Sequence, residues 1–106
     1  MLDDLKDNPL ASELIAECAA AYFCTTKKMA ASLKALRDVD LQRTTATASP
    51  AEQRRRREEI LEEAAESAWF FIIQREALKL PYYDELFADF DIPDEVRQRL
   101  GPRKIP

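Results

Sequence analysis

The sequence predicts an all-α fold: a long antiparallel helical hairpin followed by two short C-terminal helices. The first observation is that 106 residues contain one glycine, Gly101. Glycine supplies the left-handed backbone that tight turns need, so a chain with almost none has few turns. The second is a composition of 46% hydrophobic and 34% charged residues, rich in Ala, Leu, Glu and Arg, which is typical of long amphipathic helices. We expect residues 1–106 to form a single helical domain.

The first helix is predicted over residues 9–41. Asn8 and Pro9 match an N-cap followed by proline at the first helical position. From there nothing breaks a helix until about Leu41. One seam of side chains recurs at alternating steps of three and four residues, the spacing of a coiled coil: Ile15, Cys18, Tyr22, Thr25, Met29, Ser32, Leu36 and Val39.

The second helix is predicted over residues 50–79, after a connection at 42–49 that lacks periodicity. Ser49 can cap the amide of Glu52, and Pro50 is preset for the first turn. The helix ends before Leu80, because a residue that precedes proline is pushed out of the helical region.

Two shorter helices are predicted over residues 82–90 and 93–100. In the first, Tyr82, Leu86 and Phe90 fall four residues apart, and in the second Val96 and Leu100 do so. Gly101 followed by proline ends the second.

The hairpin register and the helix lengths favour a homodimer. With the connection centred near Ala46, residues 68–73 lie beside residues 19–24, and Arg75 lies near Glu17. Helices of about 45 Å overhang a compact globule of this length, whose radius of gyration is about 13 Å. The segment 68–73 is also apolar on every side, more than one partner helix covers.

Two packed hairpins would cover that segment as a four-helix bundle. The residues expected in the core or the dimer interface are Tyr22, Trp69, Phe71 and Ile72, and we expect Trp69 and Ile72 to be buried. In the alternative, a monomer, residues 82–100 fold back as the second cover.

A run of four arginines opens the second helix and is the strongest local charge feature: Arg54, Arg55, Arg56 and Arg57. Four successive helical residues point around most of the circumference, and glutamates follow at once, so we expect a solvated face with local ion pairs. The alternatives are a nucleic-acid contact and an acidic protein surface. Such a surface exists in the chain itself and could meet the arginines of another subunit: Asp84, Glu85, Asp89, Asp91, Asp94 and Glu95.

The composition argues against catalysis. Histidine is absent, which removes the commonest general base, the Ser-His and Cys-His pairs and most zinc sites. No glycine-rich stretch cradles a phosphate. A ladder of glutamates at 58–66 lies on one helix, whereas a divalent cation needs ligands from several elements. We therefore expect no catalytic residue, no cofactor and no metal.

Both cysteines are expected to be reduced thiols of a cytosolic protein, Cys18 buried on the seam and Cys24 exposed. The acidic residues 1–7 do not resemble a signal peptide, and no apolar run is long enough to cross a membrane. We expect a small cytoplasmic protein that acts by self-association and by interaction with an unidentified protein. The alternatives are a nucleic-acid-associated factor using Arg54–Arg57, and a small-ligand binder with a pocket near Tyr22, Trp69 and Tyr83.

Overall fold

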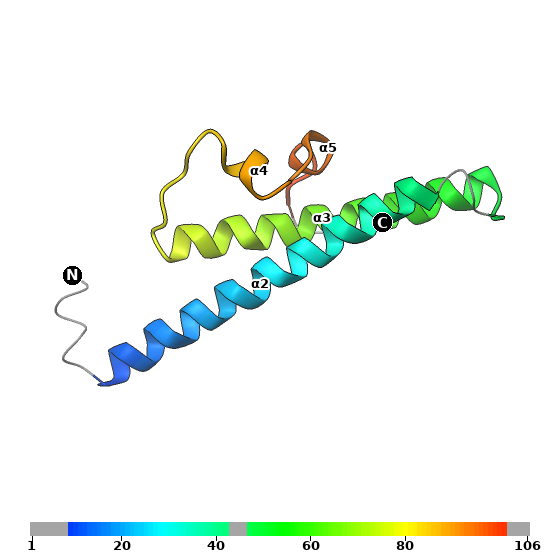
Figure 1. Ribbon diagram of the computed structural model, residues 1–106. Helices are drawn as coiled ribbons and strands as arrows, with labels where there is room; N and C mark the ends of the chain where they lie inside the picture. Colours follow the sequence, from blue (N-terminus) through cyan, green and yellow to red (C-terminus); the bar gives the residue numbers. More distant parts are fainter. Residues whose placement is uncertain (1–8, 43–46, 102–106) are drawn as a thin grey trace.

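The computed structural model describes residues 9–42 and 47–101, and these residues form an all-helical structure without strands. Two long helices, α2 (Pro9–Leu41) and α3 (Pro50–Ala77), pack against each other in antiparallel directions. Two helices of one turn each, α4 (Leu86–Asp89) and α5 (Asp94–Arg97), lie along one side of this hairpin (Figure 1). The all-α class and the packing of two long helices are thus confirmed, while the two C-terminal helices are shorter than the predicted ranges 82–90 and 93–100.

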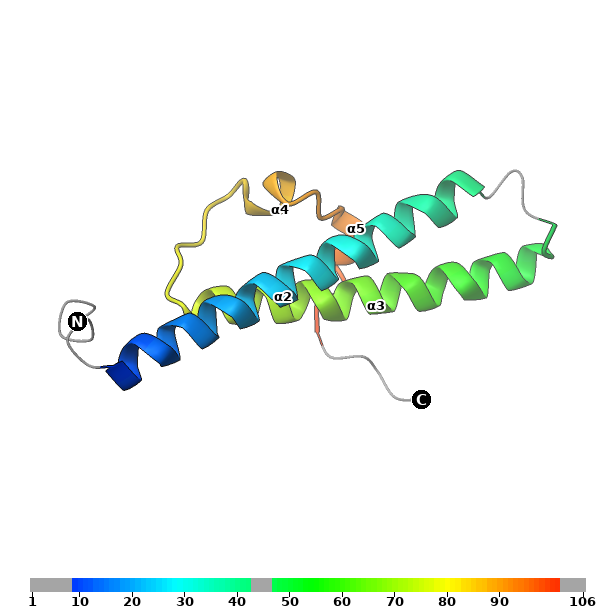
Figure 2. The same cartoon turned by 60° about the horizontal axis from the view of Figure 1, so that its bottom comes forward.

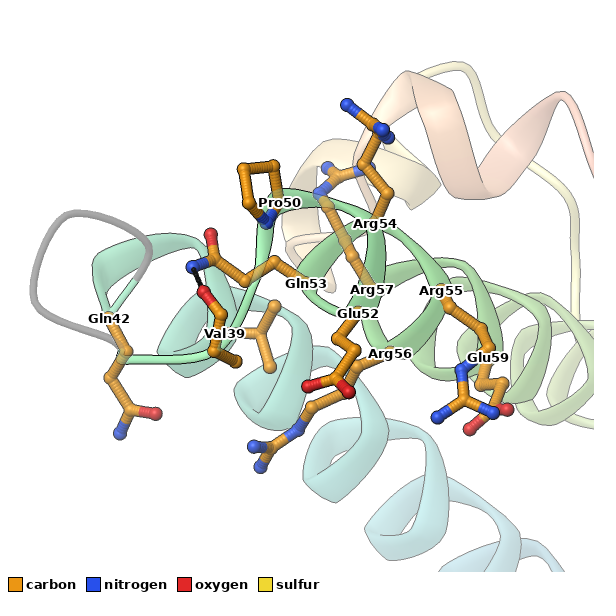
Figure 3. Close-up of a pocket in the computed structure, with 11 residues that line it drawn as sticks. Val39, Gln42, Pro50, Glu52, Gln53, Arg54, Arg55, Arg56, Arg57 and Glu59 are labelled. Carbon is orange, nitrogen blue, oxygen red and sulfur yellow. Dashed lines mark hydrogen bonds between the residues drawn. The ribbon is translucent and has the colours of Figure 1, made fainter.

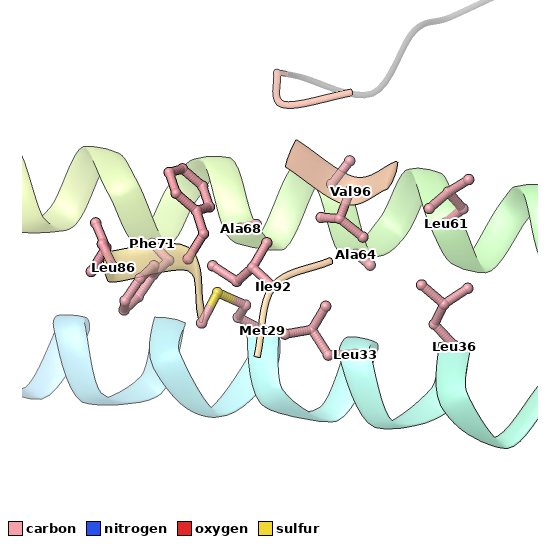
Figure 4. Close-up of a cluster of buried hydrophobic side chains, with 12 residues drawn as sticks. Met29, Leu33, Leu36, Leu61, Ala64, Ala68, Phe71, Leu86, Ile92 and Val96 are labelled. Atoms are coloured by element: carbon pink, nitrogen blue, oxygen red, sulfur yellow. The ribbon is translucent and has the colours of Figure 1, made fainter. Parts of the chain in front are cut away.

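The core lies where the hairpin meets the C-terminal segment (Figure 4). Residues 82–100 fold back over their own hairpin, which is the alternative arrangement considered from the sequence. Tyr82 does not take part in this cover and is exposed. The buried apolar side chains come from α2, α3 and this segment: Met29, Leu33, Leu36, Leu61, Ala64, Ala65, Ala68, Phe71, Leu86, Phe87, Ile92 and Val96.

The hairpin register differs from the predicted one by about two helical turns. The hydroxyls of Ser32 and Ser67 lie 3.2 Å apart, whereas a connection centred near Ala46 would have placed residue 25 opposite Ser67. In the structure α3 begins farther out than the point where α2 ends (Figure 1). The predicted register is therefore wrong, although Tyr22 still contacts the segment 68–73 through the ring of Phe71, at a centroid distance of 5.7 Å.

The first turns of α2 therefore extend away from α3 (Figure 2). We call residues 9–21 the α2 arm; its side chains from Ser12 through Ala21 are all exposed. Cys18 lies in the arm and is exposed, so its predicted burial is wrong, because the seam continues past the point where α3 can cover it. Cys24 is exposed, as predicted.

The apolar segment of α3 is also less buried than predicted. Phe71 is fully buried, but Trp69 and Ile72 are only half-buried. Helix α2 and the C-terminal segment together cover one side of α3. The ring of Trp69 lies outside this contact and packs against Phe70, at a centroid distance of 5.1 Å. The predicted burial of Trp69 and Ile72 is therefore wrong. The segment is apolar on all sides of the helix, but the rest of the structure covers only some of these sides.

Two turns adopt left-handed backbone without glycine. Lys79 ends α3 with φ 57°, and Asp91 follows α4 with φ 56°. In both places the next amide bonds back to the helix, from Leu80 to the carbonyl of Arg75 at 3.0 Å and from Ile92 to that of Phe87 at 2.8 Å. These are Schellman motifs, in which glycine is the usual residue. The low glycine content therefore did not prevent the chain from reversing direction.

The helix start at Ser49 is as predicted: its hydroxyl accepts the amide of Glu52 at 3.2 Å, and Pro50 is the first helical residue. Replacing Ser49 by alanine is expected to cost about 1 kcal/mol of unfolding free energy, because the helix loses its cap. Urea denaturation followed by circular dichroism measures this. Thr47→Ala, which removes a hydroxyl just outside the helix, is the control, and equal losses in both variants would contradict the capping role.

Candidate interaction surface

The exposed large apolar side chains gather at the open end of the hairpin. On the α2 arm, Leu10 is 75% exposed and Leu14 61%. Phe23 follows on α2 at 60%. Among the described residues only Leu41 lies at the opposite, loop end; the other exposed members are Ile15, Phe70, Ile73, Leu80 and Tyr82. A concentration of exposed apolar groups at one end of a molecule is typical of an interaction site.

The arm is helical although α3 does not support it. Its residues are mostly alanine, leucine and glutamate, which have high helix propensity, and proline starts it. A helical segment of this length is marginal in water on its own. Its continuity with the packed part of α2 sustains it, and a partner that covered its leucines would stabilise it further.

A hollow of about 730 Å³ runs along the hairpin on a face that α4 and α5 do not cover. The α2 wall carries mainly small side chains, among them Ala31, Ser32 and Ala35. The α3 wall carries Ser67 and Phe70. The remaining lining residues are Thr25, Lys28, Glu63, Glu66 and Gln74. Because small residues form most of the α2 wall, a bulky side chain from outside can come close to that helix.

The arginine run does not form one basic face. Arg54, Arg55 and Arg56 are exposed and their side chains point in different directions around a hollow of about 510 Å³ near the hairpin loop (Figure 3). Glu52 and Glu59 line the same hollow. Acidic side chains thus lie among the exposed arginines, while Glu58, which the helical spacing places four residues after Arg54, pairs with Arg99.

Arg57 differs from its neighbours because two carboxylates hold it. Its Nη1 and Nη2 donate to the two carboxylate oxygens of Glu95 at 2.8 and 2.7 Å, and its Nε donates to Asp40 at 2.7 Å. The hydrogen bonds from Arg57 hold the pKa of Glu95 below its ordinary range, and the two carboxylates raise the pKa of Arg57. This bidentate pair joins α3 to α5.

The arginine run and the acidic block thus meet within one chain, at Arg57 and Glu95. Arg99 also pairs with Glu58. The rest of the block lies at exposed positions: Asp84, Glu85, Asp89, Asp91 and Asp94. Burial and hydrogen bonding to Asp89 raise the pKa of Tyr83. Asp40 carried no sequence signal, because only the closure of the hairpin brings it to Arg57.

Acid is expected to weaken the Arg57–Glu95 pair. A carboxyl whose folded-state pKa is lowered contributes stability above its unfolded-state pKa, about 4.3, and that stability is lost as the pH falls through the lower folded-state value. Since both side chains are partly exposed, Glu95→Gln should cost only about 0.5–1.5 kcal/mol at pH 7. The difference between wild type and variant in urea denaturation should shrink toward pH 3. Asp94→Asn, on the same turn, is the control; a difference independent of pH would contradict the assignment.

Arg75 is a buried charged residue of the core, and its hydrogen bonds go to groups other than the predicted partner Glu17. It donates from Nη1 to the Tyr22 hydroxyl at 3.0 Å and from Nη2 to the Pro81 carbonyl at 2.9 Å. The rings of Phe71, Tyr83 and Phe90 surround its guanidinium at 5.9 Å. Glu17 lies on the exposed arm, and Arg75 bonds to Tyr22 and Pro81 instead.

The three aromatic residues considered for a ligand pocket divide between two groups of contacts. Tyr22 and Tyr83 both approach Arg75, whereas Trp69 packs on Phe70.

Within residues 9–42 and 47–101, no group of three or more carboxylates or thiols is arranged to hold a metal ion. In the same described residues, no helix is both long enough and apolar enough to cross a membrane. The chain matches no protein-family model, no curated protein and no solved structure.

Proposed function

We propose that this protein is a cytosolic helical protein that acts by self-association and protein–protein interaction, and not by catalysis. The observation that carries the proposal is the exposure of the α2 arm. Leu10 and Leu14 are 75% and 61% exposed there, on a stretch of α2 that lies beyond the contact with α3 among the described residues. A second copy offers the same helix and the same uncovered face, so two hairpins would complete a four-helix bundle.

The elongated shape supports the same proposal. The radius of gyration is 17.4 Å and the longest dimension 60 Å. A compact chain of this length has a radius of gyration of about 13 Å. The fold-back of residues 82–100 covers one face of the hairpin and leaves the arm and the hollow of Ala31 and Ala35 for a partner.

Sedimentation equilibrium at micromolar concentration tests the proposal. We expect a species of twice the monomer mass. Leu14→Glu should shift it toward monomer, because a charge replaces an apolar group of the interface. Leu41→Glu is the matched control, since Leu41 is a similarly exposed leucine at the loop end. A single species of monomer mass for the wild type, or equal weakening by both variants, would overturn the proposal.

A further inference from the structure

The exposed side of α2 carries a second seam with coiled-coil spacing. Its members follow one another at strictly alternating steps of four and three residues: Leu10, Leu14, Glu17, Ala21, Cys24, Lys28, Ala31 and Ala35. All are exposed except Ala35, which is half-buried. This seam extends over about seven helical turns and lies on a different face from the one that packs on α3. We call it the outer seam.

Resting on the proposed self-association, we infer that two copies pair through their α2 helices in antiparallel directions along the outer seam, with the two-fold axis level with Tyr22 and Phe23. The seam is then complementary to itself. Leu10 faces Ala35 and Leu14 faces Ala31 of the partner copy, while Glu17 faces Lys28 and Ala21 faces Cys24. Every pair occurs twice because of the symmetry.

Size complementarity supports this alignment. Leu10 and Leu14 stand at one end of the seam and Ala31 and Ala35 at the other, so at both ends of the antiparallel pair a bulky side chain meets a small one. Ala31 and Ala35 also line the hollow of about 730 Å³, whose far wall includes Phe70. The leucines of the arm of one copy can therefore pack into the hollow beside the alanines of the other copy.

Charge supports the direction. In a parallel pair each residue of the seam would face the same residue of the partner copy, so Glu17 would meet Glu17 and Lys28 would meet Lys28. The antiparallel pair replaces both repulsions by two Glu17–Lys28 contacts. Charged residues within a coiled-coil seam reduce its stability but set register and orientation, which is the role we assign to this pair.

Charge reversal tests the pairing. Glu17→Lys and Lys28→Glu should each raise the dimer dissociation constant about tenfold or more, because each puts like charges together at two places. The double variant E17K/K28E should restore association, since the opposite charges face each other again. Lys27→Glu changes the same charge one residue away from the seam and should have little effect. Circular dichroism verifies that the helices persist.

Cysteine crosslinking tests the register directly. In a Cys18→Ser background, Ala21→Cys places a thiol opposite Cys24 of the partner copy, and mild oxidation with diamide should yield a disulfide-linked dimer on a non-reducing gel. Ala30→Cys, an exposed position off the seam, is the control. If the wild type sediments as a monomer, self-association itself fails. If it is a dimer but E17K/K28E is not restored and Ala21→Cys does not crosslink, the pairing through α2 is overturned while self-association stands.

Discussion

Replacing Phe71 by alanine is expected to lower the unfolding free energy by about 3–5 kcal/mol. Phe71 is the largest fully buried side chain of the described residues. Its ring lies 5.7 Å from that of Tyr22 on α2 and 4.7 Å from that of Phe90 after α4. The substitution therefore opens a cavity at the point where α2, α3 and the C-terminal segment meet (Figure 4).

Urea denaturation at a fixed protein concentration, followed by circular dichroism, measures this loss. Trp69→Ala is the informative comparison, because Trp69 is larger, lies two residues away on the same helix and is only half-buried. It should cost about 1–2 kcal/mol, since the side chain already contacts water in the folded state. A Trp69→Ala loss equal to or above that of Phe71→Ala would contradict the packing described.

Arg75→Ala is expected to cost about 2–4 kcal/mol. The side chain fills the space between three aromatic rings and bonds to the Tyr22 hydroxyl and the Pro81 carbonyl. Its removal leaves a cavity and deprives both oxygens of their donor. The segment after α3 should loosen most, because the bond to Pro81 ties that segment to the helix.

Arg75→Lys separates charge from geometry. Lysine keeps the positive charge, but it lacks the planar fork that reaches Tyr22 and Pro81 together, so it should recover only part of the loss. Limited proteolysis of the segment at 79–85 provides a second readout, with faster cleavage expected in Arg75→Ala. An unfolding free energy within about 0.5 kcal/mol of wild type would show that Arg75 is dispensable to the core.

Local signals predicted what local interactions decide. The cap at Ser49 needs only Glu52 three residues later, so four consecutive residues contain all the information. The divergence of Arg54, Arg55 and Arg56 follows from 3.6 residues per turn in the same way. The left-handed residues Lys79 and Asp91 were missed, because no lysine or aspartate marks such a turn as glycine does.

The arrangement of the two helices depended on contacts that no short window contains. The seam of α2 pointed correctly to the face that packs on α3, since Met29 and Leu36 are buried there. How far along the helix this packing continues depends on the register. Register in turn depends on how the serines, alanines and leucines of α2 and α3 fit together.

The sequence by itself thus determined that this chain is helical, where its long helices begin and which side of α2 is apolar, because helix propensity, caps and periodicity are properties of neighbouring residues. Only the tertiary structure decided that Phe71 and not Trp69 fills the core, that Arg57 meets Glu95 and Asp40, and that the α2 arm stands clear of α3. Each of these depends on which distant residues share a space. The packing of whole helices settles this. Two helices can pack in registers that differ by a turn or two, and every one of these registers keeps the same helix propensities, caps and periodicity.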